Sequence, residues 1–337
     1  MMARFFWWLN MLLLVGSLTA QAQTNALSDS DKHALAEANK YVERANKFVK
    51  DNSLTRAKSE YQKALKIFPR HLDALYNLAI VCERLGQNDE AIQHYKQYLE
   101  LAPNDPDAWT QLGLRYDAAD RKADAQTAYE HAIAADPKFG LAHHNLGVLL
   151  KEQGKLDAAQ EQFETFVRLE EQAGRFDGDA YYSLGTLYLA RGRVKDAKLL
   201  LQKSIDSDPS VPYYNNAMGD VYLAERKPDD AMVYYRKAIE KDEKYAPAYS
   251  GMGDAYRQLG DSAKAADAYR KALELRKDYS LVYYKLGLLY ESTDPAQAIK
   301  QFESYLGSGK SLEFQDEAKA RIEKLKQSKP VTQNTTP

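Results

Sequence analysis

The chain has 337 residues, of which 45% are hydrophobic, so it is long enough to bury a core. Its 46 Lys and Arg side chains nearly balance its 48 Asp and Glu side chains, and no basic block stands out, so nucleic acid is not expected as a partner. A single cysteine excludes an internal disulfide framework and zinc sites of the CxxC type.

The first 22 residues combine Arg4, a short apolar run through Val15, and the small residues Ala20 and Ala22. This pattern is typical of a secretory signal peptide cleaved after Ala22. The alternative is an uncleaved membrane anchor, for which the apolar run is short. We therefore expect an exported mature chain with no membrane insertion after cleavage. It would be periplasmic in a bacterium with two membranes, and the alternative is secretion or a secretory lumen.

Residues 23–37 are expected to form an N-terminal lead and a helix extension. Ser28 can cap a helix that runs through Ala38 and Ala45 towards Phe48.

The stretch from Pro106 to Phe139 contains a pattern that recurs along the chain. Trp109, Leu112 and Tyr116 lie at i, i+3 and i+7, which is one face of a helix. A second helical pattern and a closing proline follow. A small residue recurs at the position of Gly113, with spacings of 34, 34, 34, 38, 34, 34 and 34 residues. The matching positions are Ala45, Ala79, Gly113, Gly147, Gly185, Gly219, Gly253 and Gly287.

These residues resemble the tetratricopeptide repeat, whose signature is W-x2-L-G-x2-Y, then A-x3-F/Y-x2-A, then P. The resemblance implies an all-α, right-handed superhelical solenoid of helix-turn-helix repeats with a C-terminal capping helix. Small residues would let the two helices of a repeat approach closely. Eight repeats are expected within 38–309: 38–71, 72–105, 106–139, 140–177, 178–211, 212–245, 246–279 and 280–309. A capping helix at 310–329, starting at Ser311, and a disordered tail at 330–337 would follow.

The fourth repeat is four residues longer than the others, and the extra residues fall at 174–177. Four residues are about one helical turn. They either lengthen the second helix or its loop, or they change the stacking and divide the array into two halves.

No motif in the chain predicts catalysis, and no cofactor is expected. His143 and His144 are neighbours on a helix and point about 100° apart, so they cannot share a metal as an i, i+4 pair can. Cys82 is expected to be a buried core thiol, with a redox or intermolecular role as the alternative. An enzyme would need perturbed groups among Asp220, Asp254 and Lys285.

In this family the first helix of each repeat lines a concave groove. Carried onto this chain, the groove positions include a run of amides that resembles part of the asparagine ladder of protein O-GlcNAc transferase, where amides bond the backbone of an extended peptide. The second half offers tyrosine and acid, which suit apolar and basic partner residues. The expected groove residues are Asn46, Tyr76, Asn77, Gln111, His144, Asn145, Tyr182, Tyr213, Asn216, Asp220, Asp254 and Tyr284.

The carboxylate clamp of chaperone-binding family members is not expected here. The corresponding positions hold Val42, Asn46, Asn77, Asp107 and Gln111, so the two asparagines match and all three cations are missing.

The resemblance thus implies a non-enzymatic scaffold that binds an extended protein or peptide segment, as an adaptor or assembly factor in the cell envelope. The alternatives are a self-associating structural array and a protein that binds carbohydrate or peptidoglycan through the groove tyrosines.

Overall fold

The computed structural model describes residues 28–308 and 313–327. The expected signal peptide, the capping position Ser311 and the tail lie outside these ranges. The described part is helical throughout, without a strand. Its helices are α3 (Asp29–Lys50), α4 (Leu54–Ile67), α5 (Leu72–Arg84), α6 (Asn88–Leu101), α7 (Pro106–Ala118), α8 (Lys122–Ala135), α9 (Gly140–Glu152), α10 (Leu156–Gln172), α11 (Gly178–Ala190), α12 (Val194–Ser207), α13 (Pro212–Ala224), α14 (Pro228–Lys241), α15 (Ala246–Gln258), α16 (Ser262–Leu275), α17 (Ser280–Tyr290), α18 (Pro295–Leu306) and α19 (Gln315–Gln327).

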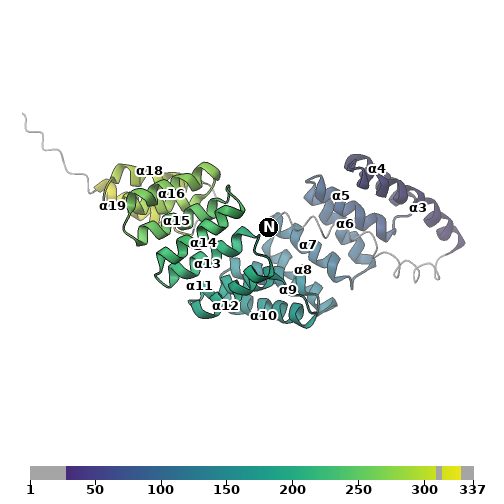
Figure 1. Cartoon of the computed structure of the whole chain (residues 1–337). Coiled ribbons are helices and arrows are strands. Elements are labelled where there is room, and N and C mark those ends of the chain that lie inside the picture. Colours follow the sequence, from purple (N-terminus) through teal and green to yellow (C-terminus); the bar gives the residue numbers. More distant parts are fainter. Residues whose placement is uncertain (1–27, 309–312, 328–337) are drawn as a thin grey trace, which may run out of the picture. The chain divides into compact units, whose positions relative to one another are not determined.

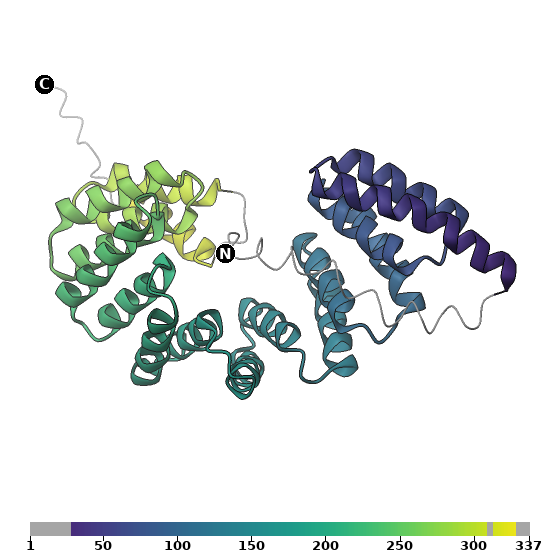
Figure 2. The same ribbon diagram turned by 45° about the vertical axis from the view of Figure 1, so that its right-hand side comes forward.

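Within each unit, consecutive helices pair into hairpins that pack on one another along the chain, from α3 to α9 in the first unit and from α11 to α18 in the second. Figures 1 and 2 both show α3 and α4 side by side. The chain divides into two compact units, one ending at Leu169 and the other beginning at Glu170, so the division falls within α10. Among the described residues, no helix is both long and apolar enough to cross a membrane.

A residue in the left-handed backbone region reverses the chain between the two helices of a hairpin. It recurs at one register, with φ between 54° and 79°: Asn52, Gly86, Asp120, Gly154, Gly192, Arg226 and Gly260. Glycine adopts this conformation without a steric cost, and Asn and Asp tolerate it better than other residues. In the sixth hairpin, Arg226 takes this position despite its long side chain.

Small residues are required where the two helices of a hairpin cross. A Cβ built on Gly219 would lie 2.5 Å from Cε1 of Tyr235, and one built on Gly253 would lie 2.5 Å from the ring of Tyr269. Such distances are well inside van der Waals contact, so an unchanged tyrosine leaves no room for a methyl group. The close approach expected from the recurring small residue is therefore confirmed.

The extra residues of the fourth repeat lengthen both a helix and its loop. Helix α10 has 17 residues, whereas α8 and α12 have 14 each. The helix is followed by Gly174, at φ 67°, and by Arg175, whose guanidinium donates to both carboxylate oxygens of buried Glu170 at 2.7 and 2.8 Å. Phe176 follows with 71% of its surface exposed, and Asp177 caps α11.

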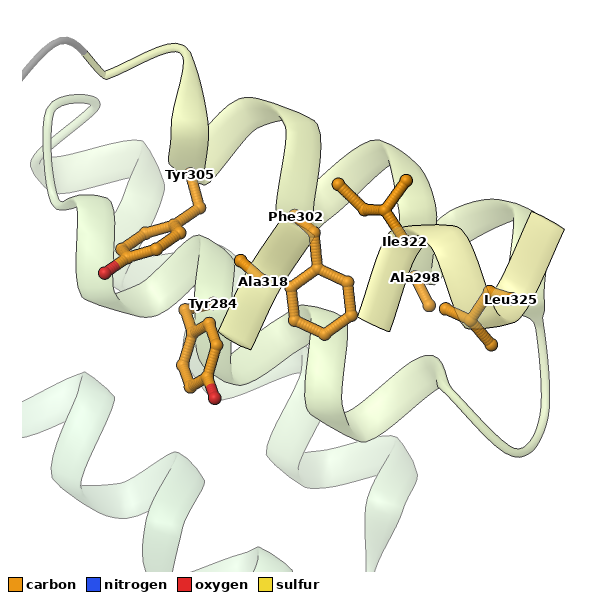
Figure 3. Packing of buried hydrophobic residues seen from close by; sticks show 7 residues of the cluster. All are labelled: Tyr284, Ala298, Phe302, Tyr305, Ala318, Ile322 and Leu325. Carbon is orange, nitrogen blue, oxygen red and sulfur yellow. The ribbon is translucent and has the colours of Figure 1, made fainter. Parts of the chain in front are cut away.

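Helix α19 covers the end of the second unit (Figure 3). Its apolar residues Ala318, Ile322 and Leu325 pack against Tyr284, Phe302 and Tyr305 of α17 and α18. The described helix starts at Gln315, four residues after the expected Ser311. Phe314 precedes it in a turn, where its ring stacks on that of Tyr284 at 4.7 Å and its backbone N–H donates to the Tyr305 hydroxyl at 2.9 Å.

Candidate partner-binding faces

The first helices of the hairpins carry the predicted groove residues. Neighbouring first helices contact each other at α3 and α5, and at α7 and α9, in the first unit, and at α11 and α13, and at α13 and α15, in the second. Side chains at equal positions of successive repeats therefore form columns. We call the set of first helices of each unit its inner face.

On the inner face of the first unit, a carboxylate joins two successive repeats. The hydroxyl of Tyr76 on α5 donates to Asp107 on α7, and Gln111 also bonds this carboxylate. Burial raises the pKa of Asp107, and the two hydrogen bonds oppose this effect. The ring of Tyr76 packs edge-on against Tyr98 at 5.2 Å. Tyr76 and Gln111 are thus held in fixed orientations before any partner arrives.

The three amides of the expected ladder, Asn77, Gln111 and Asn145, are half-buried on α5, α7 and α9. Beside Asn145, the ring of His144 packs against Phe166 with 5.0 Å between ring centroids. Asn46, at the start of the unit, accepts a hydrogen bond from Tyr61 of α4. Two of the four predicted amides in this unit, Asn46 and Gln111, are therefore already engaged within their own hairpins.

On the inner face of the second unit, three tyrosines pack together over one acid. Tyr182 of α11 lies edge-on to Tyr213 of α13 at 4.9 Å, and Tyr213 lies edge-on to Tyr214 at 4.8 Å. The hydroxyls of Tyr213 and Tyr214 both donate to Oδ1 of Asp179, at 2.5 and 2.6 Å. Burial, with the nearby Asp220 charge as a second cause, raises the pKa of Tyr182 to about 12.

Asp220 lies at the centre of the second polar group on this face. It accepts from the Tyr235 hydroxyl at 2.7 Å and from Nδ2 of Asn216 at 3.2 Å. Desolvation by burial raises the pKa of Asp220 to about 6, although the Tyr235 bond and the charge of Lys285 oppose this shift. The other amide atom, Oδ1 of Asn216, is buried without a hydrogen-bond partner.

A third polar group on this face contains Lys285 of α17 and Asp254 of α15. The Lys285 ammonium lies 2.5 Å from Oδ2 of Asp254 and donates to Oγ of Ser250 at 3.2 Å. The Tyr269 hydroxyl bonds the other carboxylate oxygen of Asp254 at 2.7 Å. The three residues that an enzyme would need, Asp220, Asp254 and Lys285, therefore belong to one hydrogen-bonded and electrostatic network.

One predicted groove residue is misplaced. Tyr284 is only 5% exposed because Phe314 stacks on its ring and α19 covers it. The sequence pattern assigned it to the inner face because it could not foretell where the capping helix packs. The prediction for Tyr284 as a partner-binding residue is wrong.

The side chains that orient the predicted residues through hydrogen bonds were not expected from the sequence. Asp107 and Asp179 each join two adjacent repeats, while Tyr61, Tyr235 and Tyr269 each bond the residue 15 positions earlier. The constant spacing of 15 was present in the sequence and could have revealed the second set.

Two further predictions concern single residues. Cys82 is buried, so its assignment to the core is confirmed. His143 is also buried, and its two ring nitrogens lie 2.8 Å from Oε1 of Gln162 and 3.1 Å from the carbonyl oxygen of Pro137.

An open cleft of about 690 Å³ lies elsewhere in the first unit. Second helices α4 and α6 contribute most of its lining, including Gln62, Lys66, His94 and Gln97. The predicted groove residues do not line it.

Tetratricopeptide repeat family models match residues 48–113, 110–159, 144–212 and 212–245, and a TPR repeat model matches 253–294. Together these matches cover more than half of the chain. The chain is a tetratricopeptide repeat protein.

Solved tetratricopeptide structures share the fold, which confirms the all-α superhelical repeat class. A tetratricopeptide repeat protein from Parabacteroides merdae matches with a TM-score of 0.62 and 19% identity, over 75% of this chain and 98% of that one. The APC/C hetero-tetramer Cut9-Hcn1 matches with a TM-score of 0.59 and 21% identity, over 81% of this chain and 52% of that one.

Curated relatives match over shorter stretches. Anaphase-promoting complex subunit 3 of Schizosaccharomyces pombe is 31% identical over 87 residues, which are 26% of this chain and 13% of that protein. Because only 13% of that protein is matched, the similarity concerns the repeats and not the whole relative.

Proposed function

We propose that this protein is a non-enzymatic scaffold that binds extended protein segments along its inner faces. Tetratricopeptide repeat proteins bind protein partners, and polar side chains recur here at equal positions of successive first helices. The observation that carries the proposal is the pre-ordering of these side chains: Tyr76, Tyr213, Asp220 and Asp254 are all held by internal hydrogen bonds. A partner then loses less binding free energy to the ordering of the scaffold.

The two inner faces favour different parts of a partner. In the first unit, the amides Asn77 and Asn145 can both donate to and accept from a peptide backbone, whatever its side chains. In the second unit, the half-buried carboxylates of Asp220 and Asp254 outnumber the one ammonium of Lys285 beside them, and this excess of negative charge favours a partner with basic side chains. The rings of Tyr182 and Tyr213 offer apolar surface beside them.

The proposal also concerns the location of the protein and its role there. We propose eight repeats, corresponding to the hairpins from α3–α4 to α17–α18, in a mature chain that begins at Gln23 and acts as an adaptor or assembly factor in the cell envelope. The signal-like pattern of residues 1–22 supports this location. Mass spectrometry of the N-terminus of the protein from its native host tests it: an intact, uncleaved start would contradict export by signal cleavage.

Affinity capture with two face variants tests the binding proposal. One carries Asn77→Ala and Asn145→Ala, and the other carries Tyr182→Ala and Asn216→Ala. The matched control replaces amides of second helices, Gln126→Ala and Gln202→Ala. A partner retained by the parent and the control, and lost by a face variant with an unchanged circular dichroism spectrum, supports the proposal. Equal retention by all variants contradicts it.

Self-association is the alternative, in which another copy fills the inner faces. Analytical ultracentrifugation of the mature chain separates the two cases. A mass that rises with concentration, and that falls to the monomer value in the Tyr182→Ala, Asn216→Ala variant, would favour a structural array over a scaffold for other proteins.

A further inference from the structure

Three unlike metal-binding side chains converge within the second hairpin of the first unit. Cys82 projects from α5, and Glu90 and His94 project from α6. One ligand atom from each residue can be chosen so that the three atoms all lie within 4.8 Å of one another. Cys82 is buried, whereas Glu90 and His94 are half-buried. They were not foreseen as a site because the sequence contains no CxxC or His-Glu-x-x-His spacing.

The hairpin itself brings the three groups together. Glu90 and His94 stand four residues apart, so they share one face of α6. The turn at Gly86, with φ 74°, folds α6 back along α5, and Cys82 lies in the last turn of α5. The convergence therefore follows from rigid secondary structure and not from a loop.

In other repeats, a cationic side chain lies over the residue at the position equivalent to Cys82. Cys82 occupies the register of Tyr116, Tyr188 and Tyr222. The guanidinium of Arg121 lies 4.4 Å from the ring centroid of Tyr116, and the ammonium of Lys198 lies 4.0 Å from that of Tyr222. In the second hairpin a thiol replaces the ring, with a carboxylate and an imidazole beside it.

A cationic side chain already stands at the edge of this group. Lys58 of α4 is the counterpart of Lys198, and its Nζ lies 2.7 Å from Oε2 of Glu90 and 2.8 Å from Oε1 of Gln87. Because Lys58 is on a flexible four-carbon stem, it can swing aside and leave Glu90 to another cation. Lys58 then acts as a competitor that weakens metal binding without abolishing it.

The residues around His94 can orient its imidazole ring, and an open cleft beside it can admit a metal ion from solvent. Nδ1 of His94 lies 3.1 Å from Oε1 of Gln97, and an N–H bond there would leave Nε2 as the ligating nitrogen. His94 and Gln97 also line the open cleft of the first unit, which gives an ion a path from solvent.

We propose that Cys82, Glu90 and His94 form a binding site for a divalent metal ion of the zinc class. Sulfur, nitrogen and oxygen donors together suit Zn²⁺, and three protein ligands leave a fourth position for water. On binding, the Cys82 thiol loses its proton to solvent as the metal–sulfur bond forms, and the metal takes the place of the Lys58 ammonium beside Glu90. This inference is independent of the proposed scaffold function.

Titration of the untagged, reduced protein with Co²⁺ tests the site. A bound thiolate gives an intense ultraviolet charge-transfer absorption, which a bystander carboxylate or histidine does not. We expect one equivalent of Co²⁺ to bind with this signal, and one equivalent of Zn²⁺ to remove it. Cys82→Ala should abolish the charge-transfer band, and His94→Ala should weaken binding by more than about tenfold, the loss typical even of a residue that only orients a ligand.

Two matched variants make the test specific. His33→Ala removes an exposed histidine of α3 and should leave Co²⁺ binding unchanged. Lys58→Met keeps the side-chain stem, removes the competing ammonium, and should bind Co²⁺ more tightly than the parent. Circular dichroism confirms that each variant is folded.

The proposal is overturned if the folded parent shows no stoichiometric thiolate band at micromolar protein. It is equally overturned if the band survives Cys82→Ala, or if Lys58→Met binds Co²⁺ no more tightly than the parent.

Discussion

The hydroxyl of Tyr235 donates a hydrogen bond of 2.7 Å to the carboxylate of Asp220, which lies 15 residues earlier in the chain. The same spacing links Tyr269 to Asp254 and Tyr61 to Asn46. In these three hairpins the second helix thus orients a side chain of the first helix. This relationship couples the packed interior of a repeat to the face on which we propose that partners bind.

Tyr95 lies in this register, but the residue 15 positions earlier is Ile80, and the Tyr95 hydroxyl is buried without a hydrogen-bond partner. Tyr95→Phe should therefore leave the free energy of unfolding unchanged or raise it by up to about 1 kcal/mol, whereas Tyr235→Phe should lower it by about 1–3 kcal/mol because a buried carboxylate loses its donor. Thermal and urea unfolding of the two variants measures the difference. Equal losses in both would show that the Tyr235–Asp220 bond does not stabilise the fold.

Arg226 occupies a left-handed position with φ 57°, where Gly260 stands in the next repeat with φ 79°. Arg226→Gly should raise the free energy of unfolding by about 0.5–1 kcal/mol, since it removes the steric cost of that backbone region at some cost in chain entropy. Gly260→Ala should lower it by about 1 kcal/mol for the same reason. Thermal unfolding of both variants provides the check, and a loss of stability in Arg226→Gly would contradict the assignment of strain to this turn.

Asp220 should make stability depend on pH. Its pKa rises from 3.8 to about 6 on folding, so between these values the folded chain binds more protons than the unfolded chain. The contribution of Asp220 is therefore most favourable below about pH 4 and is lost as the pH rises through 6. Urea unfolding from pH 4 to 8 should show this loss in the parent relative to Asp220→Asn. A difference between the two that does not vary with pH would contradict the raised pKa.

Cys82 should react slowly with alkylating reagents in the metal-free protein. Burial raises the pKa of its thiol to about 11, and the thiolate is the reactive form. Iodoacetamide labelling at pH 8, in the presence of a chelator, should be much slower in the folded chain than in urea. Equal rates would show that the second hairpin opens readily.

Much of the fold could be predicted from the sequence because the repeat imposes a fixed register. The small residues Gly219 and Gly253 identified the helix crossings, and their contacts with Tyr235 and Tyr269 follow from that register. Helix ends were harder to predict from the sequence. Helix α19 begins after Phe314, because the stacking of this ring on Tyr284 fixes where the chain turns.

The candidate site was predictable only in part. Asn216, Asp220 and Asp254 could be placed on first helices by their repeat position, but their partners on other helices depend on side-chain packing. Tyr284 shows the limit, because an element outside the repeat pattern covers it. The group of Cys82, Glu90 and His94 arises from one irregular member of the repeat series, which a consensus pattern does not reveal.

Site-specific photo-crosslinking in the native host tests the central claim most directly. A benzophenone side chain would replace Asn77 on α5 or Tyr182 on α11, and, as controls, Gln126 on α8 or Gln202 on α12. We predict a discrete adduct with a partner protein from the first-helix positions and none from the second-helix controls. Adducts confined to Gln126 and Gln202 would contradict partner binding on the inner faces.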